Sequence, residues 1–381
     1  MGGAAYTPAV SQMPIEPGFR SLGQATSRAI AQRAAARGRL QRTLLVHGPA
    51  GSGKGAFVDD LLAFLFCDAA GAERPCNACR GCRGGRARTH PDLVIGSPER
   101  WREERTTGES IVAAARSWLA DSAGAPIAGE RRVVLVEGVD RANEQTQNAL
   151  LKALEEPTSR HMFVLVADEP THVLPTIRSR SQSLRVGAVP RAELVAWLVD
   201  RERLPVDQAE DLARIAAGMA GTAIGYARTP QSVDWRRRTQ RELLGLIERG
   251  RADRFGSVRD LLDDAARLGR QQPADGGDEA PADDDIPRPT SAAQREAALL
   301  IVEAWLALAR DLLVAGAGRP QIAATATLLP DLQAVAERLG QWEITDFIAL
   351  LERIRDGLRQ NAAPRLTLEV AMLAWPTGAA R

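Results

Sequence analysis

All four cysteines of the chain fall in one short stretch: Cys67, Cys76, Cys79 and Cys82. The last three form two overlapping CxxC pairs, whose tight turns present thiolates to a single ion. A fourth thiolate from the end of a preceding helix completes a tetrahedral site with no open position for water, so we predict a structural Zn²⁺. Spacing alone leaves an iron–sulfur cluster or a thiol redox pair open as alternatives.

A second motif, Gly48-Pro-Ala-Gly51-Ser-Gly53-Lys54, follows a β-rich run and opens a helix. In this context GxxxxGK predicts a phosphate-binding loop, in which backbone N–H groups surround phosphate oxygens and Lys54 adds positive charge. The next position should carry the Ser or Thr hydroxyl that binds Mg²⁺, and here it is Gly55. The loop is therefore a degenerate nucleotide site that leaves ATP or ADP binding without hydrolysis open. A glycine-rich turn that binds nothing is the alternative.

The acidic motif that should complete a nucleotide-hydrolysing site is also incomplete. Such a site places one carboxylate for the metal and a second beside it for the attacking water at the end of a strand. Here the apolar run ends in Val136, Glu137 and Gly138. Whichever role Glu137 takes, the other carboxylate is missing, so we expect no hydrolysis.

Composition restricts the remaining function classes. With 381 residues, 45% hydrophobic and 25% charged, the chain suggests two or three globular domains. A net charge of +1 argues against coating nucleic acid by bulk electrostatics. Residues 1–20 lack the pattern of a signal peptide, and the longest apolar stretch, 297–318, is interrupted by charges. We expect a cytoplasmic protein without a membrane span, where clustered cysteines favour metal over disulfides.

Short β-rich runs alternate with helical patterns through the first half of the chain. This alternation predicts a parallel sheet covered by helices on both faces, with its ligand site at the carboxyl ends of the strands. The expected strands are Thr43–His47, Asp92–Ile95, Val133–Glu137, Met162–Ala167 and Gln182–Val186.

From Pro190 onward the pattern is helical, which sets the expected domains. We predict a mobile N-terminus at 1–18, a phosphate-loop core at 19–189, a small three-helix unit at 190–230 and a helical domain at 231–381. Within the last domain, residues 271–290 are rich in proline and acidic side chains and should form a disordered loop.

Further motifs resemble the AAA+ clamp-loader subunits of bacterial DNA polymerase III. A phosphate loop followed one helix later by a four-cysteine module is typical of that family. The resemblance is dense from about residue 19 to 190 and thin afterwards. The matching segments are Phe19–Gln24 (entry segment), His90–Leu93 (HPD step), Asn148–Pro157 (LLKxLEEP helix), Thr176–Ser181 (SRC motif, with serine for cysteine) and Trp305–Leu313 (a collar helix).

The resemblance implies an α/β AAA+ core, an α-helical lid and an all-α C-terminal collar. Four departures from the ATP-hydrolysing members favour the delta-prime branch. These are Gly55, the incomplete motif at Glu137, Ala167 at the sensor position, and the segment Gly221–Gly225, which has no lid arginine.

A delta-prime-like chain implies a non-hydrolysing stator within a DNA-directed DNA polymerase holoenzyme. Its implied partners are gamma/tau and delta subunits in a hetero-pentameric clamp loader, with the sliding clamp and primed DNA reached through that complex. Arg180 of the SRC motif would act in trans as an arginine finger on a neighbouring ATP. A solvated surface arginine is the alternative for Arg180.

Two other functions remain open from the sequence. One is an ATP-hydrolysing subunit of the gamma/tau type that tolerates Gly55. The other is a zinc-containing DNA-binding protein outside replication. ATPase activity of the isolated chain would distinguish a gamma/tau-type subunit from a stator. Co-purification with clamp-loader partners would distinguish a stator from a DNA-binding protein outside replication.

Overall fold

The chain divides into two units. The computed structural model describes residues 18–69, 71–155, 160–271, 291–319, 322–325, 328–360 and 362–376. The first unit comprises residues 1–190 and 219–221, and the second comprises 191–218 and 222–381. The predicted mobile N-terminus and acidic loop lie outside the described residues, apart from Gly18 and Gln271.

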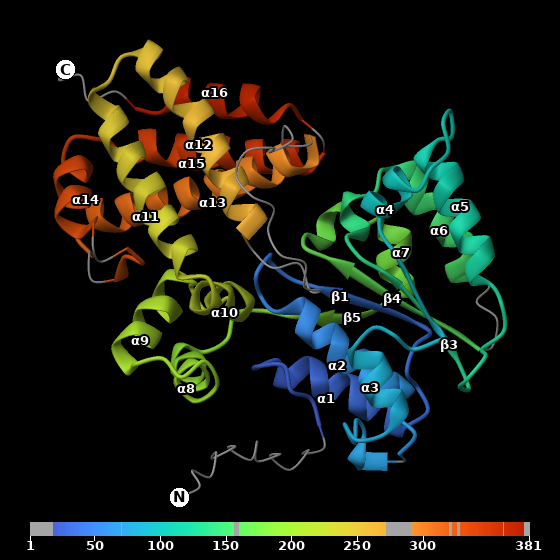
Figure 1. Cartoon of the computed structure of the whole chain (residues 1–381). Helices are drawn as coiled ribbons and strands as arrows, with labels where there is room; N and C mark the ends of the chain where they lie inside the picture. Colours follow the sequence, from blue (N-terminus) through green and yellow to red (C-terminus); the bar gives the residue numbers. More distant parts are fainter. Residues whose placement is uncertain are drawn as a thin grey trace, which may run out of the picture. The chain divides into compact units, whose positions relative to one another are not determined.

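The first unit is built on a five-stranded parallel sheet (Figure 1). Its strand order is β2-β3-β4-β1-β5, so β1 lies inside the sheet between β4 and β5. The register pairs Thr43 with Phe163 and Val133 with Met162. The strands are β1 (Thr43–His47), β2 (Leu93–Gly96), β3 (Arg132–Val136), β4 (His161–Ala167) and β5 (Gln182–Arg185).

Both faces of this sheet are covered by helices because strand residues alternate between two apolar clusters. Leu44 and Val46 pack with Phe57 in one cluster, whereas Leu45 joins Trp101 in the other. Figure 1 shows α1 and α2 on one face and α4 to α7 on the other. The helices are α1 (Ala25–Ala36), α2 (Lys54–Phe66), α3 (Arg80–Arg86), α4 (Pro98–Glu103), α5 (Ile111–Ser122), α6 (Glu144–Glu155) and α7 (Pro175–Arg180).

Local sequence sets where several of these helices begin. The side chains of Ser97 and Ser110 accept the backbone N–H groups of Arg100 and Ala113, which caps α4 and α5. Pro98 and Pro175 stand in the first turns of α4 and α7, where a missing N–H costs nothing. Short 3₁₀ turns connect other elements, at η1 (Gly71–Glu73), η2 (Val139–Arg141), η3 (Pro170–His172) and η4 (Leu246–Glu248).

The second unit is helical. Its largest apolar core joins the helices from α11 to α16 and includes Trp305, Phe347 and Met372. None of the helices within the described residues is long and apolar enough to cross a membrane. The elements are α8 (Arg191–Arg201), α9 (Val206–Ile215), α10 (Ala220–Arg228), α11 (Pro230–Gly245), α12 (Arg251–Gln271), α13 (Ser291–Gly316), α14 (Leu329–Ala336), α15 (Gln341–Arg359) and α16 (Pro364–Ala374).

The predicted fold class, a parallel sheet with helices on both faces followed by a helical remainder, is confirmed. Because all strands are parallel, their carboxyl ends meet at one edge of the sheet. The residues that follow β1, β3 and β4 at this edge are Gly48, Glu137 and Asp168. This edge is therefore where the predicted nucleotide site must lie.

Candidate functional site

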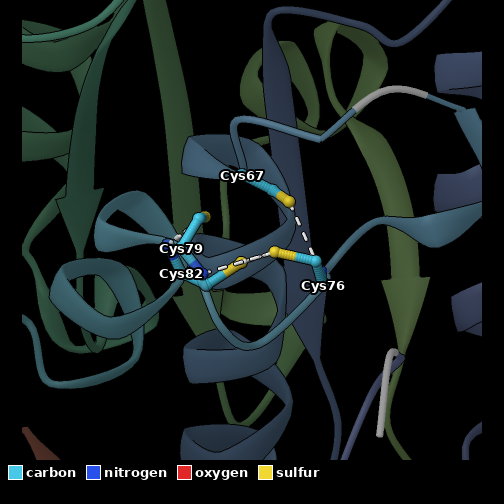
Figure 2. Close-up of side chains that lie close together, drawn as sticks. All are labelled: Cys67, Cys76, Cys79 and Cys82. Carbon is cyan, nitrogen blue, oxygen red and sulfur yellow. Dashed lines mark hydrogen bonds between the residues drawn. The ribbon is translucent and has the colours of Figure 1, made fainter. Parts of the chain in front are cut away.

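The four cysteines gather in one place (Figure 2). Their sulfur atoms all lie within 4.8 Å of one another, and the Sγ atoms of Cys76 and Cys82 are 3.9 Å apart. Four thiolates about 2.3 Å from a tetrahedral zinc ion would be separated by roughly 3.8 Å. None of the four forms a disulfide. The cluster can hold a metal ion, and its donor set and dimensions fit zinc.

Helix ends and backbone amides position these thiols. Cys67 ends α2 and Cys79 caps the start of α3. The backbone N–H of Cys76 donates to Cys67 Sγ at 3.3 Å, and that of Cys79 donates to Cys76 Sγ at 3.4 Å. Such bonds favour the thiolate, and backbone hydrogen bonds lower the pKa of Cys76 to about 7. The loop is thus arranged to present at least one thiolate near neutral pH.

The cysteine module also fixes α3 against α2. A Cβ atom on Gly81 would overlap the carbonyl oxygen of Phe66, and one on Gly85 would lie 2.8 Å from that of Leu62. Only glycine allows this close approach of two backbones. Two arginines at and after the end of α3 contact α2. Arg86 pairs with the buried Asp60, and Arg88 pairs with Asp59.

Lys54, at the start of α2, lies beside the phosphate loop. Its Nζ donates to the carbonyl oxygens of Gly48 at 2.8 Å and Pro49 at 2.9 Å. The third contact is an ion pair with Asp168 Oδ1 at 2.6 Å. An ammonium group has three N–H donors. All three of those on Lys54 therefore have acceptors within the chain.

Glu137, the carboxylate after β3, also has an internal partner. The Arg88 guanidinium donates to Glu137 Oε1 at 2.9 Å and to Asp59 Oδ1 at 2.7 Å. A Cβ atom on Gly55 would lie 3.9 Å from the same guanidinium. Burial works against the charge of Arg88, but the hydrogen bond and charge of Asp59 and the charge of Glu137 raise its pKa overall. A permanent cation thus lies beside both positions that would bind magnesium.

The position next to Glu137 cannot supply a catalytic carboxylate. Gly138 adopts φ 64°, and a Cβ atom there would overlap the guanidinium of Arg141. The carboxylate of Asp140 is engaged with the backbone, since its Oδ2 accepts the N–H groups of Asp168 and Glu169 at 3.0 and 2.9 Å. Burial raises the pKa of Asp140. Ala167, at the predicted sensor position, is fully buried and has no polar group. Among the described residues of this strand edge, the position beside Glu137 thus carries no carboxylate.

A backbone segment from later in the chain packs on the phosphate loop within the first unit. A Cβ atom on Gly221 would lie 2.9 Å from the carbonyl oxygen of Gly51 and 3.3 Å from the amide nitrogen of Gly53. From sequence, Gly221 was notable only as part of the segment that has no lid arginine. This packing leaves no room for a side chain at position 221.

Arg180, the predicted finger, is the last residue of α7. Its Nη2 pairs with Glu155 Oε1 at 3.0 Å and its Nη1 donates to the carbonyl oxygen of Thr176. The side chain is 44% exposed. It lies at the C-terminal end of a short helix on the surface of the first unit, where a second molecule can reach it.

Sequence reasoning found the loop, the cysteines and Glu137 but missed Asp168, Arg88 and Asp59. Asp168 directly follows β4, so its place at the strand edge could have been expected from topology. Arg88 and Asp59 gave no such signal, because their meeting depends on how α3 packs on α2.

Comparison with known proteins finds similar sequences among DNA polymerase III subunits. Residues 23–189 match the family described as DNA polymerase III, delta subunit. The DNA polymerase III subunit delta' of Pseudomonas aeruginosa is 33% identical over 184 residues, which cover 48% of this chain and 54% of that protein. The subunit gamma/tau of Mycobacterium tuberculosis is 26% identical over 361 residues, covering 87% of this chain and 56% of that protein.

These matches confirm the resemblance to delta-prime subunits over the N-terminal half. The chain spans only about half the length of the curated relatives that it matches. A solved gamma subunit-related protein of Thermotoga maritima is 16% identical with a TM-score of 0.41, over 91% of this chain and 98% of that one. At that level of likeness, the fold assignment rests on the sheet and helices described above.

Proposed function

We propose that this chain, related over its N-terminal half to the delta-prime subunits of DNA polymerase III, is a non-hydrolysing subunit of a clamp loader. The observation that carries the proposal is the pairing of a well-formed phosphate loop with an incomplete catalytic set. Gly55 has no hydroxyl for a metal, and Glu137 is bound by Arg88. The AAA+ scaffold is kept while the groups that cleave ATP are lost.

The partners proposed are those of the delta-prime relatives. The chain would join gamma/tau and delta subunits in a hetero-pentamer that helps to place a sliding clamp on primed DNA. Its own contribution would be a fixed position in the ring and one guanidinium, Arg180, directed at a neighbour's ATP. A guanidinium carries a permanent delocalised charge, which suits the charge that develops on a γ-phosphate.

The cysteine cluster is proposed as a structural zinc site. A zinc ion closed by four thiolates has no open position for substrate or water. What it supplies is a fixed link between the end of α2 and the start of α3. That link places Arg86 and Arg88 against the phosphate-loop helix.

A gamma/tau-type ATPase is the second candidate, because the match to that subunit extends over 87% of this chain. The test is magnesium-dependent ATP hydrolysis by the purified chain, alone and with primed DNA. We expect none above background. Turnover that Lys54→Ala abolishes would reject the non-hydrolysing assignment and favour the gamma/tau type.

A further inference from the structure

The phosphate loop already holds an anion that belongs to the chain. Two acceptors of Lys54 are loop carbonyls, and the third is the carboxylate of Asp168. In a working phosphate loop the lysine contacts the β- and γ-phosphates. Asp168 Oδ1, 2.6 Å from Nζ, therefore takes the position on Lys54 that a phosphate oxygen would take.

The same site already holds a cation that belongs to the chain. A bound metal ion would be ligated from the position of Gly55 and from the carboxylate after β3. Arg88 lies against Gly55 and binds Glu137 at 2.9 Å, and it is anchored from its other side by Asp59. This guanidinium neutralises the carboxylate that would otherwise help to attract a divalent cation.

The charges around the loop also oppose a nucleotide. Two cations, Lys54 and Arg88, are paired with three carboxylates, those of Asp168, Glu137 and Asp59. Asp140 holds this segment in place, because its Oδ2 accepts the backbone N–H groups of Asp168 and Glu169. The carboxylate of Asp168 would repel the phosphate oxygens of a di- or triphosphate that approached Lys54.

We propose that Asp168 and Arg88 replace the phosphate and the metal of a nucleotide complex, and that Asp168 excludes nucleoside di- and triphosphates from the loop. The proposal deepens the proposed function, on which it rests, by explaining how the AAA+ core keeps its folded loop without a ligand. A residue that stabilises the ligand-free loop competes directly with a phosphate for the same ammonium group.

The test is a calorimetric titration of the full chain with ADP, with magnesium and with EDTA. Asp168→Asn removes the competing charge and keeps the shape of the side chain. We expect the variant to bind ADP about tenfold tighter than the wild type or better, since a charged hydrogen bond no longer has to be displaced. Adding Lys54→Met to the variant should abolish the gain.

Glu169→Gln is the matched control, because it removes the adjacent negative charge without touching Lys54 and should leave ADP binding unchanged. If Asp168→Asn is folded by circular dichroism and binds ADP no tighter than the wild type, the proposal is wrong. If the asparagine variant does not fold, Asp168→Ala replaces it in the titration, with the same expected gain in ADP binding. Gain of binding without hydrolysis supports both proposals, whereas hydrolysis by the wild type rejects the proposed function separately.

Discussion

At the scale of single residues, the predicted nucleotide site differs from an active one in the partners of its charged side chains. Lys54 and Glu137 are both present, yet each is paired within the chain, with Asp168 and Arg88 respectively. The missing hydroxyl at Gly55 and the missing carboxylate at Gly138 could be identified from sequence. The pairings could not, because they join residues that are far apart in the chain.

Arg180 gives the sharpest prediction at this scale. Replacing it with alanine should lower the DNA- and clamp-stimulated ATPase of an assembled loader, because a neighbour's γ-phosphate loses a cation. Arginine fingers contribute on the order of 10³–10⁵ in rate, but a loader with several ATP sites should lose less in total. Stability should change little, since exposed ion pairs are worth about 1 kcal/mol or less.

Glu155→Ala is the control for this experiment. It breaks the ion pair to Arg180 at 3.0 Å and leaves the guanidinium in place. Steady-state ATPase of both reconstituted complexes decides between the roles. If Arg180→Ala and Glu155→Ala behave alike, or if neither slows the loader, Arg180 is a surface residue and not a finger.

At the scale of elements, the cysteine cluster links the ends of two helices. Cys79 Sγ accepts the backbone N–H of Cys82 and so caps α3. Replacing Cys79 with serine removes one thiolate and weakens this cap. We expect the variant to lose its zinc and to unfold at a lower temperature, because metal binding is coupled to folding. Metal analysis should find one zinc ion per wild-type chain.

Ala78→Ser is the control, because it changes a residue in the same turn without removing a thiolate. This variant should bind zinc and melt at the same temperature as the wild type. Hydrogen exchange provides a local readout, since α3 should lose protection in Cys79→Ser while β4 keeps it. Iron in place of zinc, or fully reduced protein that holds no metal, would contradict the zinc assignment.

The close packing of α2 on α3 can be tested with two glycines of one helix. Gly81→Ala should destabilise the first unit by several kcal/mol, because its Cβ atom would overlap the carbonyl oxygen of Phe66. Gly84→Ala should be nearly neutral, since its nearest neighbour is His90 Cα at 3.4 Å and alanine favours a helix. Chemical denaturation measures both, and equal losses would argue against the packing described.

Much of the first unit could be predicted from its sequence. The strand at Thr43–His47 was predicted with its observed bounds, and the other four strands lie within about a residue of the predicted ranges. Buried parallel strands are short apolar runs, which are easily recognised between glycines and charges. The short helices α3, α4 and α7 were not predicted, because six or seven residues give too few turns for a periodic pattern.

At the scale of the whole molecule, the chain combines a sheet-based unit with a helical one. The first unit carries the phosphate-loop motif, the cysteine cluster and Arg180. The second unit has its own apolar core, centred on α13 and α15. Its helical character could be predicted, but its place in an assembly is part of the proposed function and depends on partner chains.

Assembly with partner subunits is the direct test of the proposed clamp-loader role. The purified chain, mixed with gamma/tau and delta subunits, should give one complex whose mass by native mass spectrometry corresponds to a pentamer with a single copy of this chain. Three gamma/tau chains and one delta would account for the rest. A chain that stays alone in the mixture, or that replaces gamma/tau in a ring of its own copies, would contradict the assignment as a clamp-loader stator.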